Sequence, residues 1–185
     1  VLNLQFSGVV DNPEVRGIQV VRNGVPDPAV SYRYRGDGLR GSKTEGGSTT
    51  TNTWDLNAGL PVVLQDGANT YVYGLSLISQ TDGSGNQTYF LGDGLGSTRA
   101  LTDASGNVVA TYDYDVFGAV RTSTGTGSTE YRFTGQQDDA ILGYTYLRAR
   151  YYDPATGRFI SRDPFPGVVV DPVSLNPYPY ARDNP

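Results

Sequence analysis

Short stretches of alternating apolar and polar residues recur along the chain, and glycine-containing turns separate them. Near the start, Leu2, Leu4 and Phe6 alternate with polar residues, and residues 18–22 form a second extended run before Asn23-Gly24. Because alternate residues of a strand point to opposite faces, this pattern is typical of half-buried strands. Asn-Gly between two extended runs indicates a hairpin turn. No stretch of the chain keeps the 3.6-residue period of a helix. The pattern therefore predicts an all-β protein made of antiparallel hairpins.

From residue 32 onward the same pattern becomes a repeat. Pairs of aromatic residues separated by one residue recur at Tyr32/Tyr34, Tyr71/Tyr73, Tyr112/Tyr114, Tyr131/Phe133 and Tyr144/Tyr146. Trp54 and Tyr89-Phe90 fall between these pairs. With them included, the steps between units are irregular but centre on roughly 20 residues, which is typical of repeat architectures. Each unit combines an aromatic strand, a turn containing glycine and a polar strand. Asp82-Gly-Ser-Gly-Asn86 and Asp103-Ala-Ser-Gly-Asn107 are predicted to be equivalent turns, opened by aspartate.

The stretch from Tyr144 to Pro164 has the densest tyrosine and arginine content. Tyr144, Tyr146, Arg148, Arg150 and Tyr152 share one parity, so a single strand would carry them all on one face. Residues 153–157 then supply a turn, since Pro154 has a fixed φ and Gly157 tolerates a positive one. Beyond Pro164, five prolines interrupt regular structure. We therefore expect an irregular C-terminal end.

Composition narrows the classes of function. The chain has no cysteine and no histidine, which excludes disulfides, thiolate metal sites and histidine-based catalysis. We predict no cofactor, no metal and no membrane-spanning segment, because no apolar run approaches the ~20 residues that a helix needs. A net charge of -5 disfavours nucleic acid as a partner. Lys43 is the single lysine among the 14 basic residues, so arginine–tyrosine stacks and arginine–aspartate pairs are expected.

Three segments carry a family resemblance. Leu147-Arg-Ala-Arg-Tyr-Tyr-Asp-Pro154, Gly157-Arg-Phe159 and Asp163-Pro164 resemble the core signature of the Rhs and tyrosine-aspartate (YD) repeat proteins. That family includes bacterial Rhs toxins, the C components of insecticidal toxin complexes and the animal teneurins. The motif residues are Tyr112, Asp113, Tyr114, Asp115, Gly118, Arg148, Arg150, Tyr151, Tyr152, Asp153, Pro154, Gly157, Arg158 and Phe159.

The resemblance implies a shell of wound β-hairpins with an irregular C-terminal plug. It divides the chain into residues 1–30 (N-terminal strands, a degenerate repeat), 31–143 (YD hairpin repeats) and 144–185 (core and plug). It also implies a structural module of a secreted, extracellular or cell-surface protein, whose shell encloses a C-terminal toxin. The alternative is an adhesion or filament-forming YD protein without cargo. Expected partners are other repeats of the same polypeptide, or identical chains joined edge to edge because terminal strands are unpaired.

A further alternative is a self-cleaving core. In toxin members of the family, the Arg-Asp at this place belongs to an aspartyl-protease-like site, which points to Arg162 and Asp163 here. Such chemistry needs two carboxylates, one activating water and the other protonating the leaving group. Asp171 is the nearest second carboxylate, and the competing assignment of Asp163 is structural. No other enzymatic activity is expected. Arg35-Gly-Asp37 matches an integrin tripeptide, but we interpret it as a variant of the YD turn.

Overall fold

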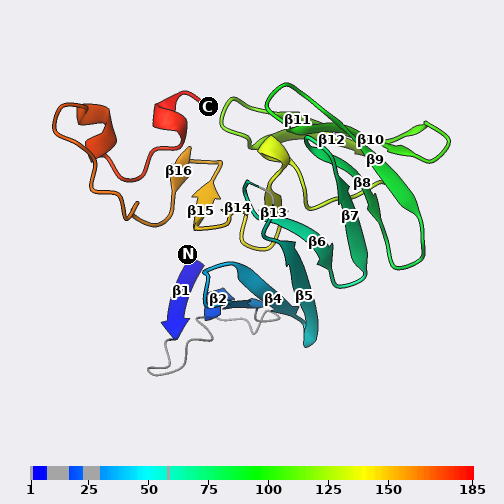
Figure 1. The fold of residues 1–185 in the computed structure, drawn as a ribbon, viewed down its shortest axis with the longest axis horizontal. Helices are drawn as coiled ribbons and strands as arrows, with labels where there is room; N and C mark the ends of the chain where they lie inside the picture. Colours follow the sequence, from blue (N-terminus) through cyan, green and yellow to red (C-terminus); the bar gives the residue numbers. More distant parts are fainter. Residues whose placement is uncertain (1, 8–16, 23–29, 58) are drawn as a thin grey trace. The chain divides into compact units, whose positions relative to one another are not determined.

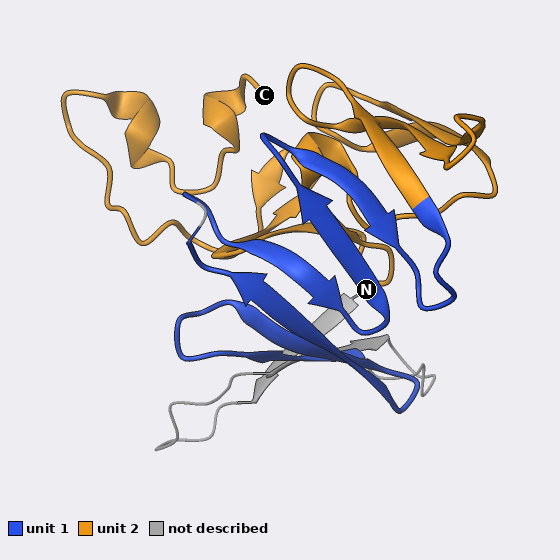
Figure 2. Ribbon diagram, turned by 45° about the vertical axis from the view of Figure 1, so that its right-hand side comes forward, with its two compact units in different colours: residues 1–87 blue, residues 88–185 orange. Residues whose placement is uncertain are grey.

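The computed structural model describes residues 2–7, 17–22, 30–57 and 59–185. The chain forms two compact units, Val1–Gln87 and Thr88–Pro185, which are coloured separately in Figure 2. Both units are built from antiparallel strands, and helix in the described part is confined to three short 3-10 turns. The prediction of an all-β protein made of antiparallel hairpins is confirmed.

In the first unit, the strands pair in chain order, each antiparallel to the next (Figure 1). They are β1 (Leu2–Ser7), β2 (Gly17–Arg22), β3 (Val30–Tyr34), β4 (Arg40–Glu45), β5 (Ser48–Asp55), β6 (Val62–Asp66), β7 (Asn69–Tyr73) and β8 (Leu77–Thr81). Every connection joins neighbouring strands, as expected for a ribbon of hairpins. The two predicted N-terminal strands are confirmed, whereas the predicted Asn23-Gly24 turn lies outside the described residues.

The second unit contains two sheets. The first continues the hairpin pattern with β9 (Gln87–Gly92), β10 (Thr98–Asp103), β11 (Val108–Tyr114) and β12 (Val120–Gly125). The second, which we call the core sheet, contains β13 (Gln137–Asp139), β14 (Tyr144–Leu147), β15 (Arg150–Asp153) and β16 (Arg158–Phe159). The 3-10 turns are η1 (Phe133–Gly135), η2 (Pro172–Leu175) and η3 (Ala181–Asp183). After β16 the chain has no further strand in the described residues, so the irregular end is confirmed.

Four hairpin turns share one geometry, and an aspartate opens each of them. In Asp115–Ala119, one carboxylate oxygen accepts hydrogen bonds of 2.9 Å from the N–H groups of Phe117 and Ala119. Gly118, the fourth residue, has a φ of 91°, a conformation that glycine adopts at little cost. The turns opened by Asp82, Asp93 and Asp103 repeat these bonds. The predicted equivalence of the Asp82 and Asp103 turns is confirmed.

The Arg35-Gly-Asp37 tripeptide lies in a degenerate copy of this turn. The backbone bonds are the same: Arg35 donates to Leu39, and Gly38 donates to Arg35. The aspartate has moved two places along, and Asp37 Oδ1 accepts from the N–H of Leu39 at 3.1 Å. These contacts give Asp37 a local structural role. This agrees with the interpretation of the tripeptide as a variant of the YD turn.

Tyrosine and arginine side chains pack together, as the composition predicted. In the first unit, Arg40 lies over the ring of Tyr32 at 5.4 Å. In the second, Arg132 lies over Tyr112 at 5.3 Å and pairs with Asp138 at 2.9 Å, while Arg99 pairs with Asp113 at 2.8 Å. The guanidinium group suits both contacts, because it is planar, weakly hydrated and able to donate in two directions. These contacts join neighbouring segments of the chain within each unit.

One prediction about the segment from Tyr144 to Tyr152 is wrong. It is not a single strand with one tyrosine–arginine face, because the chain reverses at Arg148-Ala149 between β14 and β15. Leu147 pairs with Arg150, and Tyr146 therefore lies opposite Tyr151, with ring centroids 5.2 Å apart. No glycine, asparagine or proline marks this tight turn. Arg148 adopts a φ of 55° there, and its guanidinium donates to Gln136 at 2.8 Å.

Candidate functional site in the C-terminal segment

After Asp163 the chain leaves the core sheet and returns along β16. The N–H of Phe159 donates to the carbonyl of Tyr178 at 2.9 Å, and Arg158 forms an isolated bridge with Pro179. Further along, the N–H of Asp163 donates to the carbonyl of Pro177 at 3.0 Å. The return segment, Pro177–Tyr180, thus lies beside β16 as an irregular additional strand. Because two of its four residues are prolines, it cannot complete a regular ladder.

Tyr180 places an aromatic ring among residues from three other parts of the second unit. Its centroid lies 4.6 Å from that of Tyr152, 5.9 Å from that of Phe159 and 6.4 Å from that of Phe133. Phe133 in turn lies 5.9 Å from Tyr114 of the YD repeat. Aromatic pairs at such separations stabilise a fold beyond the area that they bury. The return segment is therefore packed against both the core sheet and the repeat.

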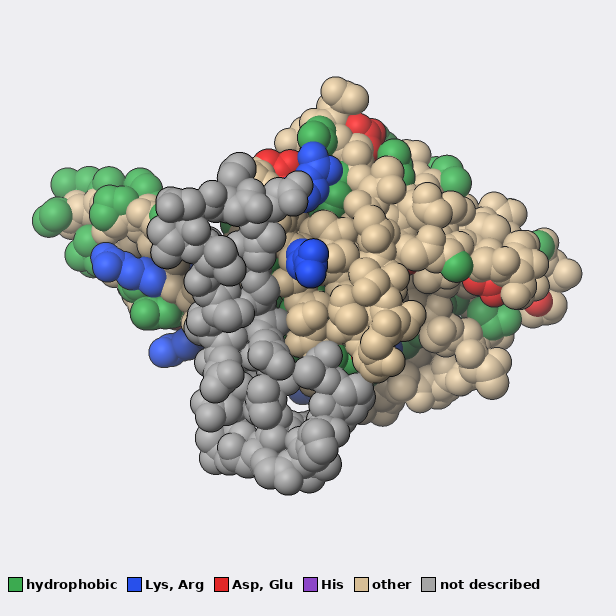
Figure 3. Space-filling model, turned by 90° about the horizontal axis from the view of Figure 1, so that it is seen from below, with side chains coloured by type: hydrophobic (Ala, Val, Ile, Leu, Met, Phe, Trp, Pro, Cys, Tyr) green, Lys and Arg blue, Asp and Glu red, His purple; other side chains and the backbone are tan. Residues whose placement is uncertain are grey.

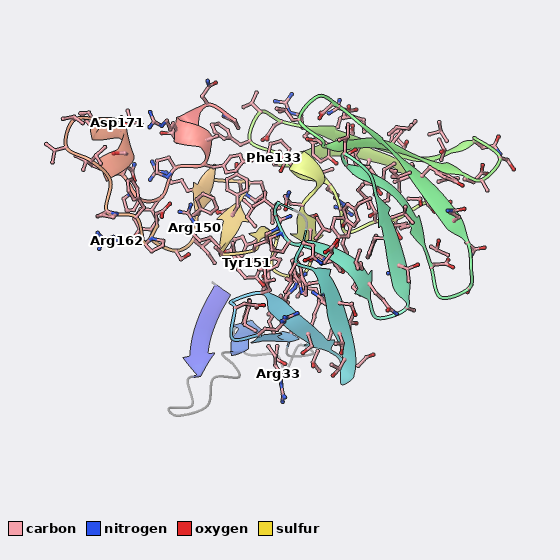
Figure 4. All side chains as sticks on the ribbon, in the orientation of Figure 1. Arg33, Phe133, Arg150, Tyr151, Arg162 and Asp171 are labelled. Atoms are coloured by element: carbon pink, nitrogen blue, oxygen red, sulfur yellow. The ribbon has the colours of Figure 1, made fainter. Side chains whose placement is uncertain are left out.

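Arg150 also contacts the return segment. Its guanidinium pairs with Asp163 Oδ2 at 2.8 Å, lies 3.5 Å from the centroid of the Phe159 ring, and donates to the carbonyl of Pro177 at 3.4 Å. Figure 4 labels Arg150 beside the strands of the core sheet. One arginine thus joins β15, β16 and the return segment, a combination that lysine could not reproduce.

The two predicted catalytic residues have different environments. Arg162 is exposed, and Asp163 uses both carboxylate oxygens: Oδ1 accepts from the N–H of Phe165 at 2.9 Å, and Oδ2 pairs with Arg150. Asp171, the candidate second carboxylate, pairs with Arg182 instead, and Figure 4 draws it well away from Arg162. No interaction between the described residues joins the two carboxylates. The known contacts of Asp163 are those of a structural residue, and its catalytic role stays a prediction.

The YD motif residues divide into packing and turn roles. Tyr112 is buried with Leu101 and Ala110, and the hydroxyl of Tyr114 donates to the carbonyl of Thr98 at 2.7 Å. Asp115 opens the turn described above. The exposed Asp113 accepts from Arg99 and from the Thr122 hydroxyl.

The core-sheet motif residues likewise pack or turn the chain. Tyr151 and Tyr152 are buried, and Asp153 opens the Asp153–Gly157 turn by accepting from the N–H of Ala155 and the hydroxyl of Thr156. Pro154 lies within that turn. Gly157 ends the turn with a φ of 70°, and a Cβ there would lie 2.9 Å from the Phe117 ring.

Burial shifts the pKa of three side chains in this region. Burial raises the pKa of the Tyr114 and Tyr152 phenols well above the ordinary value. Burial also raises the pKa of the Asp138 carboxyl, although the neighbouring Arg132 acts in the opposite direction. Among the described residues, no three or more carboxylates gather as a metal site would require. No helix in the described part is long and apolar enough to cross a membrane.

Two important contact partners could not be found by sequence reasoning. Phe117 provides the carbonyl that accepts from the Tyr152 hydroxyl, and Tyr180 completes the aromatic cluster. Tyr180 lies in the proline-rich sequence beyond Pro164, which predicted only an irregular end. Nothing local, however, indicates which strand that segment contacts.

A ribbon of antiparallel hairpins with aspartate-opened turns, closed by a folded-back aromatic segment, defines a YD-repeat shell module. The Teneurin YD-shell family model matches residues 65–185, well over half of the chain. The chain belongs to this family, as its motifs predicted.

Relatives and solved structures agree with this assignment. The tRNA3(Ser)-specific nuclease WapA of Bacillus spizizenii is 34% identical over 176 residues, covering 90% of this chain and 8% of the relative. The toxin protein Tse5 of Pseudomonas aeruginosa is 36% identical over 103 residues, covering 56% of this chain and 8% of Tse5. The crystal structure of TcdB2-TccC3 superposes with a TM-score of 0.70 at 22% identity, covering 100% of this chain and 10% of that one. The chain therefore spans a tenth or less of these proteins and corresponds to a YD-shell module of Rhs and toxin-complex proteins.

Proposed function

We propose that this chain is the closing end of a YD-repeat shell, and that its parent polypeptide encloses a C-terminal toxin domain within that shell. The observation that carries the proposal is the folded-back segment. Arg150, Asp163 and the Tyr152–Tyr180 pair fasten the chain end against the core sheet, where an open ribbon would simply stop. Such a fastened end suits a wall that must stay closed around its contents.

The surface of the same segment supports the proposal. Six apolar residues from Phe165 to Leu175 are exposed, and Val169 and Val170 reach 85% and 94%. Figure 3 shows a group of hydrophobic side chains on this segment. The loop is held in shape, because the Ser174 hydroxyl bonds to the N–H and carbonyl of Val168. A shaped apolar loop in contact with water is unusual, and an enclosed polypeptide would cover it.

The names of similar proteins support a toxin as the class of cargo. WapA is named as a tRNA nuclease and Tse5 as a toxin, and one similar structure is described as TcdB2-TccC3 without its hypervariable C-terminal region. By analogy, the parent protein acts outside the cell that makes it, or at that cell's surface. The module contributes containment, and the chemistry belongs to the enclosed domain.

The test is limited proteolysis of the intact parent polypeptide. We expect sequence beyond residue 185 to resist protease in the unaltered protein and to become sensitive in the Arg150→Ala and Tyr152→Ala variants, which weaken the closure. Arg121→Ala, at an exposed strand residue, is the matched control and should remain resistant. Equal sensitivity of the downstream sequence in all four proteins would show that the shell does not enclose it.

A second candidate is adhesion at a cell surface. The observation in its favour is the similarity to Salivary gland surface protein 1 of Aedes aegypti, 37% identical over 105 residues. Adhesion predicts binding of the purified parent to cells without any protease-protected downstream domain. The proteolysis experiment therefore separates the two candidates.

A further inference from the structure

β12 is the last strand of its sheet, and its outer edge is available. All six of its residues are exposed, and β11 is the strand that it pairs with. No hydrogen bond joins the opposite edge of β12 to any other described residue. A row of unpaired backbone donors and acceptors on an edge strand is a template for another strand.

Little in the sequence of β12 protects this edge. Natural edges are usually blocked by lysine, proline or a run of charges. Val120-Arg-Thr-Ser-Thr-Gly125 contains one charge, Arg121, which lies where the register with β11 shifts. Threonine and valine favour extended structure. The run from Thr122 to Gly125 is therefore uncharged, and its two threonines favour extended structure.

We propose that two copies of this chain join β12 to β12, antiparallel, about a twofold axis that passes between the two copies of Ser123. A twofold axis between two antiparallel neighbours is perpendicular to the sheet, so each face of one copy continues the same face of the other. With the two Ser123 residues opposite each other, Thr122 of one copy lies opposite Thr124 of the second copy. Arg121 lies opposite Gly125.

The side chains on that face fit this register. A polar ladder already crosses the sheet: Arg99 donates to Asp113 at 2.8 Å, the Thr122 hydroxyl donates to Asp113 at 3.1 Å, and the Thr111 and Thr124 hydroxyls are 2.6 Å apart. Threonine pairs across antiparallel strands are stabilising. The Thr122–Thr124 contact between copies would repeat the Thr111–Thr124 contact. A register centred on Arg121 would instead oppose two like charges.

Introduced cysteines test this contact, because the chain has none of its own. Residues directly opposite in an antiparallel pair have Cβ atoms ~4.5–5.5 Å apart, near what a disulfide requires. We expect Ser123→Cys to form an interchain disulfide several-fold faster than Ser105→Cys. Ser105 is the matched control, an exposed serine in the β10–β11 turn. Cross-linking is the suitable readout, because one short strand pair buries little area and holds weakly.

Charged variants in the Ser123→Cys background test the register. Glutamate at both positions 122 and 124, or lysine at both, opposes like charges and should slow cross-linking. Mixing the two variants opposes unlike charges and should restore it. The proposal is overturned if Ser123→Cys links no faster than Ser105→Cys, or if the charged variants leave the rate unchanged. Growth into long head-to-tail oligomers would also overturn it. The proposal is independent of the enclosed cargo, so neither result bears on the proteolysis test.

Discussion

The hydroxyl of Tyr152 donates a hydrogen bond of 2.7 Å to the backbone carbonyl of Phe117. Tyr152 lies in the core sheet and Phe117 in the turn of the YD repeat, so the bond fastens the closing segment to the last complete repeat. Tyr152 is also completely buried. Its ring packs against Phe159 and Tyr180, which makes it the point where repeat, core sheet and return segment meet.

Removing this hydroxyl should weaken the fold measurably. We expect Tyr152→Phe to lower the free energy of unfolding by about 1 kcal/mol, since the Phe117 carbonyl loses its donor. Tyr152→Ala should cost about 3–5 kcal/mol, because it also leaves a cavity. Urea denaturation measures both. Tyr178→Phe, at a residue that is 40% exposed, is the control, and an equal effect of the two phenylalanine variants would contradict the role of the bond.

Two glycines with the same turn geometry should respond differently to alanine. Gly106 and Gly118 have φ values of 84° and 91°, but a Cβ on Gly106 meets nothing within 4 Å, whereas one on Gly118 would overlap the Phe133 ring. Gly106→Ala should cost about 1–2 kcal/mol through backbone strain alone. Gly118→Ala should cost a further ~1–3 kcal/mol for the clash. Thermal denaturation of the pair gives the difference, and similar melting temperatures would mean that Phe133 moves away freely.

The turn aspartates should make the stability of the fold depend on pH in the acid range. The Asn107 side-chain and backbone N–H groups hold the pKa of Asp103 below its ordinary value, and Asn86 does the same for Asp82. A folded pKa below the unfolded one stabilises the protein above the unfolded pKa, and this contribution is lost as pH falls through the folded pKa. Asn107→Ala should raise the Asp103 pKa towards its ordinary value while leaving that of Asp82 unchanged. Carboxyl chemical shifts measured by NMR against pH test this, and an unmoved Asp103 pKa would refute the assigned cause.

Breaking the Arg150–Asp163 pair should loosen the return segment. Asp163→Asn removes a charge-assisted hydrogen bond, for which the expected loss is about 1–3 kcal/mol. Asp183→Asn, at an exposed aspartate, is the matched control. Hydrogen exchange should show faster exchange at the N–H of Phe159, which bonds to Tyr178, in the first variant only. Unchanged exchange there would show that the aromatic cluster alone holds the segment.

The same substitution tests self-cleavage in the parent polypeptide. If Arg162 and Asp163 belong to a cleavage site, the unaltered parent should migrate as two fragments on a denaturing gel, and Asp163→Asn and Asp171→Asn should each give one intact chain. Cleavage that persists in Asp163→Asn excludes this residue as catalytic. Cleavage that is lost only in Asp163→Asn would exclude Asp171 as its partner.

The sequence alone determined the class of fold, because its main signals are local. The alternation of aromatic and polar residues specifies strands over distances of a few residues. The aspartate-opened turns are equally local, since Asp103 bonds to N–H groups within the same five residues. The repeated motif was long enough to indicate the family. Arginine–tyrosine stacking and arginine–aspartate pairing also followed from composition, since the basic residues are almost all arginine in a chain rich in tyrosine and aspartate.

Only the tertiary structure decided where the chain reverses in its C-terminal segment and what its charged motif residues contact. Arg148-Ala149 carries no turn residue, and the positive φ of Arg148 accompanies a hydrogen bond to Gln136, which is distant in sequence. Asp163 has Arg150 as its partner, and Tyr180 meets Tyr152, because the chain returns along β16. Such contacts depend on the length and direction of an irregular segment. The local sequence of a proline-rich segment does not indicate which distant residues it will contact.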